Sequence, residues 1–78
     1  MHYQCEMTLR RAEGALVRVL GTTERRGFRP VSFEGDTHGH SDHWKLRMTV
    51  EGDRPAGSLQ GQLAKLYDCL SVEVSQCR

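Results

Sequence analysis

The chain is organised around the sequence EGALVRVLGTTERRGF, residues 13–28. Its least polar side chains recur every three or four residues, which is the spacing of one face of a helix. That face comprises Leu16, Val19, Leu20 and Thr23. Gly14 precedes the first apolar turn, and Gly27 follows two arginines whose charges suit the negative end of the helix dipole. The stretch therefore predicts an amphipathic helix with a glycine at each end.

Strands are predicted on both sides of this helix. Apolar and polar residues alternate over residues 3–9, 44–50 and 71–75, as they do in strands with one buried face. The alternation is clearest over residues 44–50, which we expect to form a central strand. Residues 28–33 are also strand-like, but Pro30 lacks an amide donor and therefore predicts an edge strand or a bulge.

A second amphipathic helix is predicted after the Gly-Asp-Arg-Pro sequence of residues 52–55, with Ser58 or Asp53 as its cap. Its apolar face comprises Leu59, Leu63, Leu66 and Tyr67. The order strand, helix, strand, strand, helix, strand predicts an α+β fold, the ferredoxin-like βαββαβ sandwich. In that fold a four-stranded antiparallel sheet has its first and third strands at the centre and both helices on one face. We expect residues 1–78 to form this single domain, with residues 76–78 frayed.

Length and charge limit the functions open to the chain. A domain of 78 residues has a thin core, which a second subunit would help to stabilise. With 11 Lys and Arg residues against 10 Asp and Glu residues, the net charge of +1 gives no attraction to nucleic acid or to a membrane surface. No apolar run approaches the roughly 20 residues of a membrane span, and the polar start lacks the apolar core of a secretion signal. We therefore expect a cytoplasmic protein.

No catalytic constellation is recognisable in the sequence. Cys5, Cys69 and Cys77 are odd in number and lack the Cys-x-x-Cys spacing, which argues against a disulfide framework and against a zinc site. Cys5 and Cys69 are expected to pack as small hydrophobic residues. Neither the cysteines nor the serines have a base and an orienting group that the sequence identifies, so we do not expect an enzyme.

Histidines are concentrated in the loop of residues 35–43, which contains His38, His40 and His43 beside two carboxylates. The His-x-His-x-x-His spacing is compatible with a soft metal cation. All the ligands would come from one loop, however, whereas structural metal sites normally join separate elements. A solvated loop is therefore the preferred interpretation, and a metal-binding module is the third hypothesis for this chain.

The predicted open face of the sheet is polar and mixed in charge. It carries Gln4, Glu6, Thr8, Lys45, Arg47, Thr49 and Glu73. RNA-binding sheets of this fold stack bases on exposed aromatic side chains, whereas Tyr3 and Trp44 alternate with the buried set. The pattern therefore argues against nucleic-acid binding.

Gly14 has two interpretations. It is either a helix-entry residue with no other role, or a turn without a side chain that receives a ligand carboxylate beside the free amides of the helix start.

Four segments carry a resemblance to a known family: EGALVRVL at residues 13–20, RGF at 26–28, LRMTV at 46–50 and QLAKLYD at 62–68. The chain resembles an ACT domain, and within that family the small regulatory subunit of acetolactate synthase (acetohydroxyacid synthase), isozyme II type. The first two segments are general to ACT domains. The Gln-Leu-x-Lys-Leu-x-Asp stretch is more specific to the synthase small subunits, and the short length, without a C-terminal domain, is similar to the isozyme II type.

This resemblance implies the βαββαβ fold and a regulatory role. Such a small subunit has no active site and no cofactor of its own. It binds a large catalytic subunit that uses thiamine diphosphate, Mg²⁺ and FAD in the first common step of branched-chain amino acid synthesis, and it raises the activity of that subunit. The alternative hypothesis is a stand-alone ACT domain that senses an amino acid and acts on another enzyme.

The resemblance also implies the place of an amino-acid site, formed by Arg11, Glu13, Gly14 and Ala15. In valine-responsive small subunits, an asparagine at the position of Arg11 helps to hold the ligand at the dimer interface. Arginine has donors only and would repel the ligand's ammonium group. The isozyme II type is also the valine-insensitive one, so we expect a weak response to valine or none.

The predicted edge strand suggests how two copies associate. An unpaired strand edge favours a symmetric partner, so we expect a homodimer in which the two sheets are joined edge to edge. The residues expected at this edge are Phe28, Pro30, Val31 and Phe33.

Overall fold

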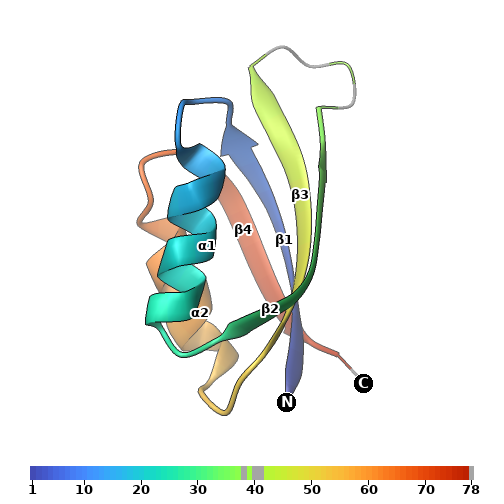
Figure 1. Cartoon of the computed structure of the whole chain (residues 1–78), viewed down its shortest axis with the longest axis vertical. Helices are drawn as coiled ribbons and strands as arrows, with labels where there is room; N and C mark the ends of the chain where they lie inside the picture. Colours follow the sequence, from blue (N-terminus) through green and yellow to red (C-terminus); the bar gives the residue numbers. More distant parts are fainter. Residues whose placement is uncertain (38, 40–41, 78) are drawn as a thin grey trace.

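The chain forms one antiparallel sheet with two helices packed on one of its faces (Figure 1). The computed structural model describes residues 1–37, 39 and 42–77. The elements in chain order are β1 (His2–Arg10), α1 (Ala15–Arg25), β2 (Arg29–Asp36), β3 (His43–Glu51), α2 (Ala56–Ala64) and β4 (Cys69–Gln76). The strand order β2-β3-β1-β4 places the first and third strands at the centre. The predicted ferredoxin-like βαββαβ fold is therefore confirmed.

The period-two alternation accounts for the core. β1 pairs along its whole length with β3, so that Tyr3 lies opposite Val50 and Cys5 opposite Met48. These residues face the helices and are almost inaccessible to solvent. The whole buried set is Tyr3, Cys5, Met7, Leu9, Ala15, Val19, Phe28, Leu46, Met48, Val50, Leu59 and Leu63. The two central strands thus supply more than half of it, as their clear alternation predicted.

Helix α1 lies between the two predicted glycines but is rotated relative to its predicted face. Gly14 (φ 77°) and Gly27 (φ 87°) both adopt the left-handed conformation that glycine tolerates best. The buried side chains are Ala15, Val19, Thr22 and Thr23. The prediction is therefore confirmed for Val19 and Thr23, whereas Leu16 and Leu20 are only partly buried against the core. Thr23 can lie in the interior because its hydroxyl donates to the Val19 carbonyl at 2.8 Å, which satisfies its polar group.

Helix α2 differs from its prediction at both ends. Pro55 is the N-cap residue and no side chain caps the helix, so the predicted caps, Ser58 and Asp53, are wrong. Ser58 lies in the first turn instead, where its amide donates to the Pro55 carbonyl. The helix ends at Ala64, because the chain then turns to enter β4. Tyr67 lies in that turn and is 86% exposed, so it does not belong to the apolar face.

Strand β2 is an edge strand with a bulge, and the position of Pro30 accounts for both. The register with β3 shifts between Pro30 and Ser32, and β2 has no neighbour on its other side. The strand begins at Arg29, one residue later than predicted, and continues through Asp36. Phe28 precedes it and is buried, with its ring edge-on to Tyr3 at 6.0 Å between centroids. Phe28 is therefore a core residue.

The two ends of the chain lie close together at one end of the sheet (Figure 1). Gln76 is the last residue of β4, and the amide of Cys77 donates to the His2 carbonyl at 2.9 Å. The predicted fraying is therefore wrong for these two residues, because β1 provides a backbone partner; Arg78 lies outside the described residues. In the part of the chain that the structure describes, neither helix has the length and apolar character needed to cross a membrane.

The small core makes Phe28 a sensitive position. Phe28→Ala is expected to lower the free energy of unfolding by about 3–5 kcal/mol, because the cavity adds to the lost burial. Val17→Ala, at a residue that is 73% exposed on α1, is the control and should change stability by less than about 0.5 kcal/mol. Urea unfolding followed by circular dichroism measures both. Equal effects of the two substitutions would contradict this description of the core.

Candidate functional site

The glycine turn between β1 and α1 is the first part of the candidate site. Gly14 adopts φ 77° and ψ 2°, and the turn is closed by the amide of Ala15, which donates to the Ala12 carbonyl at 3.1 Å. Ala15 itself is buried against the sheet. The Gly14 carbonyl accepts the first helical hydrogen bond, from the amide of Arg18 at 3.0 Å. The turn is therefore held by backbone contacts on both sides of the glycine.

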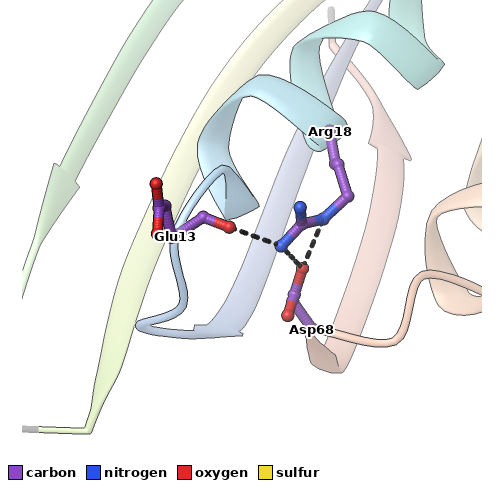
Figure 2. A network of polar contacts seen from close by, with 3 residues as sticks. All are labelled: Glu13, Arg18 and Asp68. Atoms are coloured by element: carbon purple, nitrogen blue, oxygen red, sulfur yellow. Dashed lines mark hydrogen bonds and ion pairs between the residues drawn. The ribbon is translucent and has the colours of Figure 1, made fainter.

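An arginine and a buried aspartate lie beside this turn (Figure 2). The Arg18 Nε and Nη2 atoms both donate to Asp68 Oδ2, at 2.8 and 2.6 Å. Nη2 also donates to the Glu13 carbonyl at 2.9 Å. Hydrogen bonds of this kind, between a guanidinium and a carboxylate, are among the strongest that side chains form. The contact joins the first turn of α1 to the residue that precedes β4.

Asp68 contacts a third element through its backbone. Its carbonyl accepts a hydrogen bond from the amide of Arg10, the last residue of β1, at 2.7 Å. The Asp68 side chain is only 3% exposed, whereas that of Arg18 is 48% exposed. A buried carboxylate needs a charged or hydrogen-bonding partner to offset its lost hydration, and Arg18 provides it while its own charge stays partly in water. Asp68 therefore fixes the ends of β1 and α1 relative to β4.

Gly14 allows this arrangement for a second reason besides its positive φ. A Cβ atom at residue 14 would lie 2.9 Å from Arg18 Nη1. The guanidinium thus lies against the bare Cα of the turn. One interpretation of the sequence was that this turn receives the carboxylate of a ligand. In the structure the Arg18 guanidinium, which is paired with Asp68, lies beside the turn.

The predicted ligand residues do not all lie together. Gly14, Ala15 and the carbonyl of Glu13 share the turn with Arg18, while the Glu13 carboxylate points away from the guanidinium (Figure 2). The Arg11 guanidinium lies over the Trp44 ring, 5.2 Å from its centroid. The Arg11 amide donates to the Asp42 carbonyl at 3.0 Å, so Arg11 is held at the start of β3.

Two residues of the site, Arg18 and Asp68, were not predicted from the sequence. In the sequence, Arg18 lies outside the apolar face of its helix, and Asp68 ends the QLAKLYD segment. The available signal for Asp68 was an acidic residue between apolar or aromatic neighbours, directly before a strand. Its partner lies 50 residues away, and no spacing rule indicates which arginine it is.

The histidine loop is only partly described. His43 begins β3, and its Nδ1 lies 3.0 Å from Asp42 Oδ1. His38 and His40 lie outside the described residues. The described residues contain no group of three His, Cys, Asp or Glu side chains placed to hold a metal ion.

The thiols are poorly suited to nucleophilic chemistry. Burial raises the pKa of the Cys5 thiol from 9.0 to about 11, and the nearby Cys77 adds to the increase. Burial also raises the pKa of Cys69. A nucleophilic cysteine must be a thiolate, and at neutral pH these two thiols are protonated.

Two of the four residues predicted at the dimer edge are exposed, and the prediction is wrong for Phe28, which precedes β2 and is buried in the core. Val31 is 56% exposed and Phe33 37% exposed, while Pro30 is partly buried at the bulge. Phe33 lies opposite Met48, a core residue, and therefore belongs to the helix side of the sheet. The edge strand β2 thus carries two exposed apolar side chains, those of Val31 and Phe33.

Comparison with known families matches residues 11–72 to the ACT domain. The chain belongs to the ACT domain family. ACT domains are small regulatory domains without catalytic activity of their own, and the glycine turn, α1 and the sheet lie mostly within the matched region. Among solved structures, the chain is similar to the C-terminal domain of the MgtC protein from Mycobacterium tuberculosis. That likeness has a TM-score of 0.73 at 17% identity and covers 97% of this chain and 86% of the other, which supports the fold. No curated protein sequence matches significantly.

The Arg18–Asp68 contact predicts a measurable cost when its charge is removed. Asp68→Asn keeps the size of the side chain but weakens both charge-assisted hydrogen bonds, so stability should fall by about 1–3 kcal/mol. Glu13→Gln is the matched control, because this network uses only the backbone carbonyl of residue 13. Urea unfolding at pH 7 compares the two, and an unchanged midpoint for Asp68→Asn would contradict the assigned role.

Proposed function

We propose that this ACT domain is the non-catalytic small subunit of an acetolactate synthase, isozyme II type, in branched-chain amino acid biosynthesis. It binds the large catalytic subunit in the cytoplasm and raises its activity. Thiamine diphosphate, Mg²⁺ and FAD belong to the large subunit in this proposal. The family membership supports a regulatory role, and the resemblance of residues 62–68 to the synthase small subunits supports this particular partner.

The observation that carries the proposal is the buried position of Asp68. The sequence segment most specific to the synthase small subunits ends at this residue. Its carboxylate contacts Arg18 in the first turn of α1, beside the glycine turn that is general to ACT domains. One contact therefore joins the segment specific to the synthase small subunits to the segment general to ACT domains. This is expected if both segments belong to one family fold.

The proposal predicts activation without intrinsic activity. The pure chain should form no acetolactate, while adding it to the large subunit from the same source should increase the rate of that subunit. An unrelated ACT domain at equal concentration is the control. If the rate stays unchanged, the small-subunit assignment is wrong, and a stand-alone amino-acid sensor becomes the better hypothesis.

We also propose that two copies associate through β2. The unpaired edge strand, the exposed Val31 and Phe33 and the small core support a homodimer with a sheet continued across the two-fold axis. The bulge beside Pro30 restricts the regular pairing to the second half of the strand.

Light scattering tests this association. The wild-type chain should be a dimer, and Phe33→Lys should shift it toward the monomer, because a charge would be buried in the joined edge. Tyr67→Ser is the control, since this residue is more exposed than Phe33 and lies beyond α2. A wild-type monomer at high protein concentration would contradict the proposal.

The response to valine is expected to be weak or absent. The family asparagine is replaced by Arg11, and in this structure a second guanidinium, that of Arg18, lies against Gly14. Loss of one polar contact and addition of a like charge should cost about 1–3 kcal/mol, or roughly ten- to more than a hundredfold in affinity.

Calorimetric titration of valine, together with the rate of the reconstituted enzyme at millimolar valine, measures this response. The wild-type chain should show no saturable binding, and Arg11→Asn should increase the affinity. Saturable binding by the wild type with inhibition of the enzyme would show that the argument from Arg11 is wrong.

A further inference from the structure

Both helices lie on one face of the sheet, and no other element that the structure describes covers the opposite face (Figure 1). This face has a hollow of about 740 Å³, which lies over residues 6–8, 34–36, 45–47 and 71–73, in the half of the sheet where β2 ends and β3 begins. The charged side chains around this hollow are Glu6, Glu34, Asp36, Lys45, Arg47 and Glu73. We call this surface the open face. Its side chains alternate with the core residues along each strand, so it is set by the same pattern that forms the core.

One row of the open face runs across all four strands and is unbalanced in charge. The strand registers align Glu73 with Glu6, Glu6 with Arg47, and Arg47 with Glu34. Arg47 Nε lies 3.9 Å from Glu6 Oε1, and Nη1 lies 3.6 Å from Glu34 Oε1. Both distances exceed the roughly 2.7–2.9 Å of a charge-assisted hydrogen bond. A single arginine is thus shared loosely between the carboxylates of its two neighbours.

The other end of this row contains two like charges. Glu6 and Glu73 lie directly opposite each other on β1 and β4. Like charges at directly opposed positions of an antiparallel pair destabilise the sheet. A cation placed above them from outside would relieve this repulsion, so the row favours a positively charged partner.

The neighbouring row does not compensate for the imbalance. It aligns Ser71, Thr8, Lys45 and Asp36, and the Lys45 ammonium donates to the Thr8 hydroxyl at 3.0 Å. Its one cation and one carboxylate cancel. Around the hollow, four carboxylates are therefore set against two cations, a local net charge of −2 at neutral pH. Outside the hollow the same face carries Glu51 with Arg10 and Arg29, and Arg29 is paired with Glu51.

The local charge of the hollow decides between its possible occupants. A phosphate of nucleic acid or of an anionic membrane would be repelled there, and so would the same hollow of a second copy. A bound metal ion has no support, since the described residues contain no suitable group of three ligands. A protein surface with exposed lysines or arginines is complementary to the row of carboxylates.

We propose that the open face is the surface that docks on the large catalytic subunit, and that it meets a basic patch there. This inference rests on the proposed function. One four-stranded face measures roughly 19 by 30 Å, or about 570 Å², which is smaller than the roughly 800 Å² that each partner contributes to a stable interface. Two copies joined through β2 would present two such faces in one continuous sheet and exceed that area.

A charge reversal on the open face tests the proposal without endangering the fold. Glu73→Lys places a cation opposite Glu6, which should leave stability unchanged or raise it. The same substitution should weaken binding to the large subunit at least about tenfold, because two positive surfaces would then meet. The loss should be greatest at low salt and decrease as the salt concentration rises.

Glu24→Lys is the matched control. It makes the same change in net charge at an exposed residue of α1, on the opposite side of the sheet, and should alter the affinity less than twofold. If wild-type chain binds and Glu73→Lys binds equally well, the open face is not the docking surface, although the small-subunit function stands. If the wild-type chain does not bind the large subunit at all, both proposals are wrong.

Discussion

The contact between Arg18 and Asp68 is the constraint on which the arrangement of this domain depends. A buried carboxylate is costly unless it is paired, and here one guanidinium pairs it from the first turn of α1. The backbone of Asp68 simultaneously receives the last amide of β1. The residue that precedes β4 is therefore joined to both β1 and α1, which lie more than 40 residues earlier in the chain. Among the described residues, no buried side-chain nitrogen or oxygen is left without a hydrogen-bond partner.

The Arg18–Asp68 contact also lies beside the glycine turn at the start of α1. Because Arg18 approaches the bare Cα of Gly14, the turn that ACT domains place at the start of α1 lies beside an internal ion pair. The edge of β2, with exposed Val31 and Phe33, and the open face with its row of carboxylates lie outside this contact. A small core gives this domain few other ways to gain stability.

Local sequence patterns predicted the helices and strands, but they did not predict the contacts between residues that are distant in the chain. The alternation in residues 44–50 and the missing amide of Pro30 predicted a central and an edge strand, because both features are local properties of the backbone. The predicted face of α1 is confirmed for Val19 and Thr23 and is displaced toward Ala15 and Thr22, so that Leu16 and Leu20 pack at the margin of the core. Arg18 and Asp68 could not be paired from the sequence, since they are 50 residues apart in the chain and come together only in the complete fold.

A double-mutant cycle on Arg18 and Asp68 tests this account most directly. Arg18→Met, Asp68→Asn and the double variant are compared with the wild type by urea unfolding at pH 7. The account predicts that the double variant is more stable than the sum of the single effects implies, by about 1 kcal/mol or more, because removing either partner alone leaves the other unpaired. Effects that add within about 0.5 kcal/mol would contradict it, since they would show that the two side chains act independently.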